Sequence, residues 1–171
     1  MEKSNKPEVW LRGPVEGITP LLQPVAHAIL QAREEVNAIM ADFPEILLWV
    51  NPVGLASPAF HLQHLSGVLN RLFTYAKGEM LTQHQHNKLD AEGKMPEIGY
   101  SVMNLLEVFN RQVDDSIKQL SETNELILTE KRGVGRGQLP STVIGLYTHA
   151  AEHTMRHVGQ LLVTARIIKG Q

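Results

Sequence analysis

The spacing of apolar residues constrains the fold of this sequence more than any other feature. Over four long segments the apolar side chains recur at alternating steps of three and four, which places them on one face of an α-helix. The sequence therefore predicts four helices, at about residues 20–41, 58–77, 100–121 and 141–168. Because each helix must bury its apolar face against another, we expect an all-α fold, namely an antiparallel four-helix bundle in which the longer links allow a crossover connection.

Residues with strong positional preferences mark the ends of these helices. Ser57 is a good N-cap for the second helix, and Pro58 suits the first helical position. Ser141 is predicted to cap the last helix, which should close near Gly170 because glycine readily adopts the left-handed conformation. The start of the first helix is less sharply marked, since Pro24 is tolerated only near its first turn.

The remaining segments are predicted to be connections. Residues 42–57 combine prolines and a glycine with several apolar residues, which indicates an irregular segment packed over the core. Residues 79–99 are mostly polar, so we expect an exposed excursion that has room for a short helix. The basic, glycine-rich residues 129–140 lack the Gly-Lys-Ser/Thr ending of a phosphate-binding loop and are predicted to form a mobile connector. No strand is expected, the nearest pattern being the short run ELILT.

Composition limits the range of functions. A chain of 171 residues with 43% apolar content is expected to form a single domain over residues 1–171. A net charge of −2 with evenly scattered charges argues against nucleic acid or a membrane as a partner, and the polar N-terminus carries no apolar signal segment, which favours a cytoplasmic location. Because the sequence contains no cysteine, a metal would have to take nitrogen or oxygen ligands, and any thiol chemistry would need a thiol from outside.

Three histidines recur at every fourth residue in the last predicted helix, within THAAEHTMRHVGQLL. His153 and His157 fall on the inward stripe of that helix, one turn apart, and His149 lies at its edge. Burying two imidazoles costs solvation free energy unless their nitrogens are satisfied, and two protonated rings would repel each other. A shared divalent cation would meet both demands.

The second predicted helix offers a third ligand. His61 and His64 lie one turn apart, and His64 begins an apolar row, which makes it the better candidate to point inward. Three histidines with an open coordination position are typical of a catalytic metal site rather than a structural one. The alternative that these are ordinary hydrogen-bonded core histidines stays open, as do registers that use His61 or His149. His27 is interpreted as packing, and the QHQH run at residues 83–86 as a solvated loop.

The sequence resembles the DinB-like (DinB/YfiT-like) family of helical-bundle proteins. The resemblance depends on SPAFHLQHLSGVLNRL, on EHTMRHVGQ and on the four-helix periodicity across nearly the whole chain. The family signature is one histidine from the second helix and a His-x-x-x-His pair on the last helix, followed by Gly-Gln. In this sequence the signature maps to His64, to His153 with His157, and to Gly159 with Gln160.

The resemblance implies a divalent-metal cofactor, with zinc or nickel favoured over iron or manganese, bound in a bundle that often forms a homodimer. It also implies metal-dependent chemistry on a small-molecule substrate, either hydrolysis or S-transfer with bacillithiol, mycothiol or glutathione. Gln160 would either hydrogen-bond near the ligands or make a polar contact between helices. A non-enzymatic, metal-binding stress-response protein that forms a homodimer is the alternative, and a purely structural bundle is the third possibility.

Overall fold

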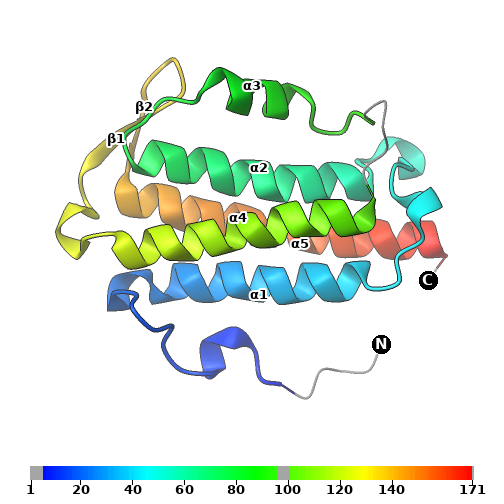
Figure 1. Ribbon diagram of the computed structural model, residues 1–171, viewed down its shortest axis with the longest axis horizontal. Coiled ribbons are helices and arrows are strands. Elements are labelled where there is room, and N and C mark those ends of the chain that lie inside the picture. The colour runs from blue at the N-terminus through cyan, green and yellow to red at the C-terminus, as the bar shows by residue number, and fades with distance from the viewer. Residues whose placement is uncertain (1–5, 96–100, 171) are drawn as a thin grey trace.

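Four long helices, each with one buried face, lie side by side along most of their length (Figure 1). The computed structural model describes residues 6–95 and 101–170. The four helices are α1 (Gln23–Met40), α2 (Pro58–Ala76), α4 (Val102–Glu122) and α5 (Val143–Lys169). The prediction of an all-α bundle is therefore confirmed.

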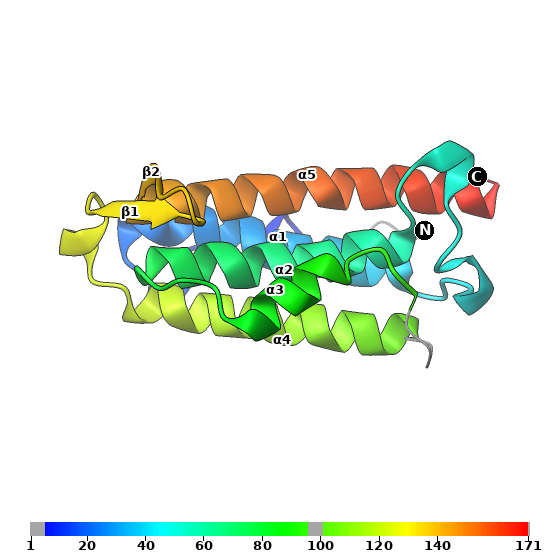
Figure 2. The same ribbon diagram turned by 90° about the horizontal axis from the view of Figure 1, so that it is seen from above.

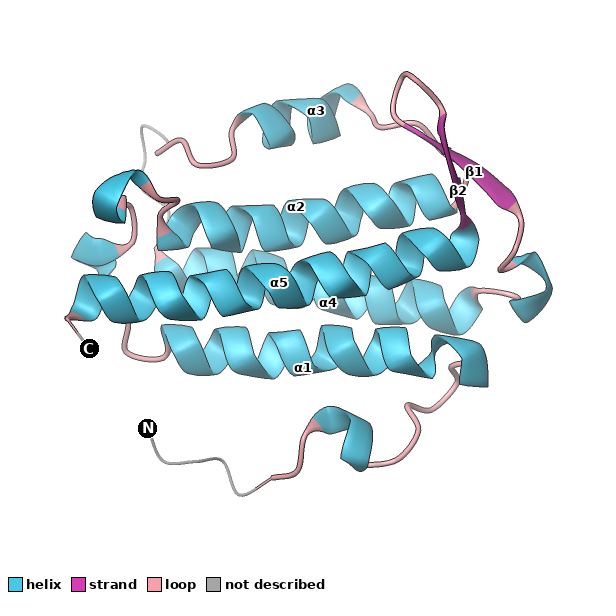
Figure 3. Ribbon diagram, turned by 180° about the vertical axis from the view of Figure 1, so that it is seen from behind, coloured by secondary structure: helices cyan, strands magenta, loops and turns pink. Residues whose placement is uncertain are grey.

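The four helices form a square in which α2 packs against α4 and α5, and α1 packs against the same two helices. The chain runs in one direction along α1 and α5 and in the opposite direction along α2 and α4 (Figures 1 and 3). The bundle is thus antiparallel between these two pairs. The connection between α2 and α4 carries the chain back along the bundle, and it includes the short helix α3 (Gln83–Asp90), which lies outside the bundle over α2 (Figure 2).

The observed helix ends follow local sequence signals. The Ser57 side chain accepts a hydrogen bond from the backbone N–H of Phe60, and Gly170 ends α5 with φ 71°, so both of these predictions are confirmed. The predicted cap Ser141 is wrong, because the adjacent Thr142 is the residue that accepts from Gly145. A 3₁₀ turn at Pro20–Leu22 precedes α1 and delays its start.

Residue 100, where the third predicted helix begins, lies outside the described residues, and α4 is observed from Val102. Its N-cap is Ser101, whose side chain accepts from the backbone N–H of Asn104. The last predicted helix also begins two residues late, at Val143, because the chain before it is paired in a β-hairpin.

The glycine-rich segment is a β-hairpin, and its prediction as a mobile connector without strands is wrong. Strands β1 (Lys131–Val134) and β2 (Leu139–Thr142) pair antiparallel, with Val134 opposite Leu139 next to the turn. Gly135 takes a positive φ of 66° in that turn, a conformation that glycine adopts without strain. The run ELILT is not a strand but contains a 3₁₀ turn at Glu125–Ile127.

Apolar side chains from all four helices meet in one core. The connection between α1 and α2 contributes to it, as predicted, through Leu48, which is fully buried, although Ile46 on the same connection is 85% exposed. In the parts of the chain that the structure describes, no helix is both long and apolar enough to span a membrane. Among the fully buried side chains are Ile29, Leu62, Leu65, Leu69, Phe109, Leu120 and Leu161.

Candidate metal centre

The three predicted imidazoles come together between α2 and α5. One ring nitrogen each from His64, His153 and His157 lies within 4.8 Å of the other two. The ring centroids are 4.3 Å apart for His64 and His157, 4.7 Å for His153 and His157, and 5.2 Å for His64 and His153. The cluster therefore joins two helices that are adjacent in the bundle but distant in the sequence.

Helical spacing explains how α5 supplies two of these rings. Residues four apart lie one above the other on a helix face, so His153 and His157 project on the same side. The neighbouring positions on this face are small, since Ala150 is fully buried and Ala151 nearly so. Small side chains let α5 lie close to α2, where Ala59, five residues before His64, is also fully buried.

A carboxylate outside the bundle holds His64. The Nδ1 atom of His64 lies 2.6 Å from Glu92 Oε2, and Arg71 Nη1 donates to Glu92 Oε1 at 2.6 Å. The Glu92 side chain is only 7% exposed. Burial by itself would raise the pKa of Glu92, but the hydrogen bonds from His64 and Arg71 lower it below the ordinary value for a glutamate. Glu92 is therefore ionised at neutral pH and accepts the proton of His64 Nδ1.

Glu92 was not identified from the sequence. It follows α3 in the polar excursion, where no periodicity or motif connects it to a histidine 28 positions away. The nearest signal is Gly67, a glycine inside α2 between His64 and Arg71. A glycine inside a helix lowers its stability, so it indicates a close approach by another group.

His61 lies outside the three-nitrogen group but contacts it. Its ring is 4% exposed, and its Nδ1 is 3.2 Å from Nδ1 of His157. This contact leaves Nε2 of His157 available to the cluster. His149, the other alternative, is exposed, with Nδ1 3.6 Å from Glu152 Oε2, although its ring touches that of His153 edge-on. The structure thus separates the predicted triad from both competing histidines.

The cluster favours neutral imidazoles. Burial, followed by the charge of His64, lowers the pKa values of His61 and His157 to about 4. Burial and His64 also lower the pKa of His153. Neutral imidazole carries the lone pair that binds a metal, so these rings are in their ligating form at neutral pH.

The donor set fits a divalent cation. Zinc binds imidazole nitrogen at about 2.0–2.1 Å, so three nitrogens already within 4.8 Å of one another need only small side-chain rotations to share one ion. His153 Nδ1 is buried and has no hydrogen-bond partner among the described residues. Phe60 stacks on His64, with ring centroids 5.3 Å apart and planes 12° from parallel, and so shields one side of the cluster.

The remaining histidines have other surroundings. His27 Nε2 lies 3.0 Å from the backbone oxygen of Gly13, and its packing role stays a prediction. The QHQH run is not a loop, because it forms the first turn of α3 behind a capping box in which Thr82 and Gln85 exchange hydrogen bonds. His84 in that run is exposed.

Two polar features of α5 lie on its exposed side. Arg156 forms an ion pair with Glu152, one turn before it. Gln160 is also exposed, and over residues 6–95 and 101–170 the structure gives it no hydrogen bond to the imidazoles. Its predicted role beside the ligands therefore has no support in this structure.

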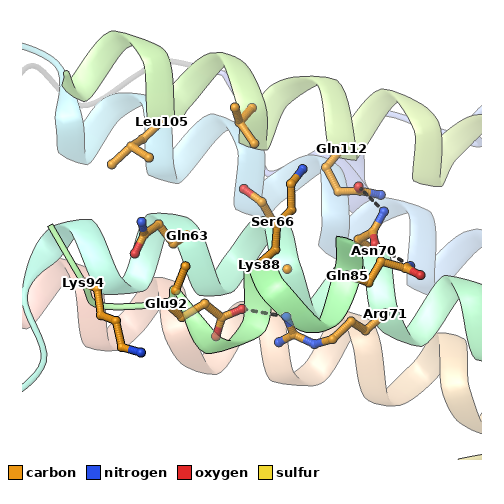
Figure 4. A pocket seen from close by; sticks show the side chains of 13 residues that line it. Gln63, Ser66, Asn70, Arg71, Gln85, Lys88, Glu92, Lys94, Leu105 and Gln112 are labelled. Carbon is orange, nitrogen blue, oxygen red and sulfur yellow. Dashed lines mark hydrogen bonds and ion pairs between the residues drawn. The ribbon is translucent and has the colours of Figure 1, made fainter. Parts of the chain in front are cut away.

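A cavity of about 280 Å³ lies between α2, α3 and α4 (Figure 4). The ion pair between Arg71 and Glu92 forms part of its lining. Leu105 and Val108 of α4 and Lys88 of α3 are among the residues that line it. The same carboxylate thus borders the imidazole cluster and this cavity.

The fold and the site together define a class of protein, a four-helix bundle with an imidazole cluster between two of its helices. The sequence model of the DinB superfamily matches residues 28–161, and the chain belongs to that superfamily. A solved structure described as the crystal structure of the conserved protein of locus from Enterococcus faecalis is similar, with a TM-score of 0.68 and 16% identity over 90% of this chain and 99% of that chain. This likeness shows the fold. No curated protein matches the sequence.

Proposed function

We propose that this protein is a metal-dependent enzyme whose divalent ion is bound by His64, His153 and His157. The observation that carries the proposal is the convergence of three ring nitrogens within 4.8 Å of one another. The low pKa of His157 supports it, because a ring that stays neutral can ligate down to mildly acidic pH. Membership of the DinB superfamily is consistent with metal binding.

The reaction we propose is the transfer of a low-molecular-weight thiol to an electrophilic small molecule. A divalent ion with three protein ligands supplies an open position in which an external thiol can bind and lose its proton at neutral pH. The chain contains no cysteine, so it has no thiol of its own to compete for that position. Bacillithiol, mycothiol and glutathione are the candidate thiols, and zinc or nickel is the candidate metal.

The side chains of this protein have separate tasks in such a reaction. The three imidazoles hold the ion, and Phe60 keeps water from one face of His64. His61 contacts Nδ1 of His157 and so leaves the other nitrogen of that ring for the ion. The lowered pKa values of His153 and His157 keep these two rings neutral, so they add no positive charge that would oppose cation binding.

A conjugation assay on protein of measured metal content tests this proposal. The purified chain is loaded with zinc or nickel and mixed with each thiol and a chlorodinitroarene, and S-conjugate formation is followed. We expect conjugation well above that of a His153→Ala variant carrying no metal. If the loaded protein binds metal but accelerates none of these reactions, the non-enzymatic alternative is supported and the transferase proposal is contradicted.

The homodimer is also a proposal. Val163 and Ile167 lie one turn apart on α5 and are 57% and 50% exposed, which offers an apolar contact for a second copy of the chain. Light scattering of the purified protein gives the test. A dimer mass that falls to a monomer mass in a Val163→Lys variant supports the proposal, and a monomer mass for the unaltered chain contradicts it.

A further inference from the structure

We infer that Glu92 is a positioning residue that fixes the orientation of His64 for metal binding. Arg71 holds the carboxylate of Glu92 in place, and Gly67 leaves room for both side chains. The inference rests on the proposed metal site. It assigns a task to the excursion between α2 and α4, in which the partly buried Leu81 also packs against the bundle core.

The two oxygens of Glu92 have different partners, so its orientation is fixed. Oε2 receives the proton of His64 Nδ1 at 2.6 Å, while Oε1 receives an N–H of Arg71 at 2.6 Å. With its Nδ1 proton held by Glu92, His64 presents its other nitrogen, Nε2, to the cluster, and this atom lies 2.9 Å from Nε2 of His153. The carboxylate thus selects the tautomer whose free nitrogen faces the cluster.

Gly67 makes this arrangement possible. A Cβ atom at position 67 would lie within 2.5 Å of Arg71 Nη1 and closer still to Glu92 Oε1. Any larger residue would therefore push the carboxylate or the guanidinium away from the helix. Because glycine weakens a helix, its presence inside α2 has no benefit for the helix itself. Room for the ion pair explains it.

The excursion is attached to α2 on both sides of Glu92. Before it, Gln85 of α3 donates to the side-chain oxygen of Asn70 at 2.8 Å. Directly after it, the backbone N–H of Gly93 donates to the side-chain oxygen of Gln63 at 2.7 Å. These contacts hold the backbone of Glu92 over the middle of α2. The excursion therefore carries a carboxylate to a ligand that belongs to another element.

The inference is tested by measuring the affinity for Zn²⁺ in competition with a chromogenic chelator. The proteins compared are the unaltered chain and the variants Glu92→Gln, Gly67→Ala and Lys88→Gln. Loss of the carboxylate is expected to weaken Zn²⁺ binding by about 10- to 100-fold. Lys88 borders the same cavity but is exposed, so its variant is the matched control and should bind as the unaltered chain does.

The Gly67→Ala variant separates positioning from a structural role. Alanine favours helix more than glycine, so a glycine with no part in the site should be replaced at equal or higher thermal stability and unchanged affinity. We expect a weakened affinity for Zn²⁺ instead, together with a melting temperature that does not fall in the same proportion. Unchanged affinity in Gly67→Ala would overturn the role of Gly67, and unchanged affinity in Glu92→Gln would overturn the inference as a whole.

A second readout needs no metal. Nitrogen NMR of the imidazole rings should find His64 in the Nδ1-protonated tautomer in the metal-free protein, and in a mixture of tautomers after Glu92→Gln. A mixture already present in the unaltered chain would overturn the role of Glu92. If the unaltered chain binds no Zn²⁺, the proposed function fails, whereas full binding by Glu92→Gln contradicts only this inference.

Discussion

At the scale of single residues, the imidazoles of His61 and His157 connect the site to the stability of the protein. The pKa of each is lowered to about 4, first by burial and then by the charge of His64. An unfolded histidine titrates near pH 6.5, so the unfolded chain binds protons at these positions before the folded chain does. Stability from this source is complete above pH 6.5 and is lost as the pH falls toward 4.

We therefore predict that the metal-free protein becomes less stable between pH 6.5 and about pH 4.5, by roughly 1–2 kcal/mol after allowance for solvent screening. Urea unfolding in the presence of a chelator measures this. The His61→Asn variant should show a weaker pH dependence. His149 is exposed, so His149→Asn is the control and should behave as the unaltered chain does. Constant stability over this range would contradict the prediction.

The sequence allowed some residues of the site to be predicted and not others. His153 and His157 could be predicted because four-residue spacing on an amphipathic helix determines the direction of their side chains. His64 could be predicted because it begins an apolar row on a second helix. Glu92 could not be found in this way, since its position depends on how a long polar connection folds back over α2. The contact of His61 with His157 depends in the same way on tertiary packing.

At the scale of secondary-structure elements, Arg132 helps to attach the β-hairpin to the bundle, beside Val134, which packs against the core. Arg132 Nε donates to the backbone oxygen of Ala76 at the end of α2, at 2.9 Å, and a second nitrogen of Arg132 pairs with Glu130. The Arg132 side chain is 15% exposed. The hydrogen bond therefore joins β1 to the C-terminus of α2, a helix end that favours positive charge.

We predict that Arg132→Ala destabilises the protein by about 1 kcal/mol, the value of a partly buried hydrogen bond to the backbone. The hairpin amides should exchange with solvent faster, while those of α2 and α5 keep their protection. Hydrogen exchange measured residue by residue gives the test. Arg136 is exposed at the hairpin turn, so Arg136→Ala is the control. Equal exchange rates in both variants would contradict the anchoring role.

The elements differ in how far local sequence determines them. The four long helices were predicted to within a few residues because their apolar stripes and caps are local signals. The hairpin was missed because residues 131–134 and 139–142 show no alternation of apolar and polar side chains, and its pairing is stabilised by contacts with α2. The short α3 was only allowed for, since its polar sequence carries little periodicity.

At the scale of the whole molecule, a single hydrophobic core fixes the relative positions of α2 and α5, the two helices that carry the imidazoles. Phe109 of α4 is fully buried and ranks among the largest such side chains. It belongs to the same buried cluster as Leu161 of α5 and Leu65 of α2, so the core reaches both helices that carry the imidazoles. The position of the rings thus depends on packing well away from them.

We predict that Phe109→Ala lowers the free energy of unfolding by about 3–5 kcal/mol, the cost of removing a large buried ring and leaving a cavity. Chemical denaturation measures the change. Val108 is the adjacent residue and is 41% exposed, so Val108→Ala is the control and should cost under about 1 kcal/mol. A similar small cost for both variants would contradict the assignment of Phe109 to the core.

The central claim is that His64, His153 and His157 together bind one divalent ion. Calorimetric titration of the metal-free protein with Zn²⁺ tests it most directly. We predict one ion per chain, with binding abolished in each of the variants His64→Ala, His153→Ala and His157→Ala and retained in His149→Ala. Absence of binding by the unaltered chain, or full binding by any of the three triad variants, would contradict the claim.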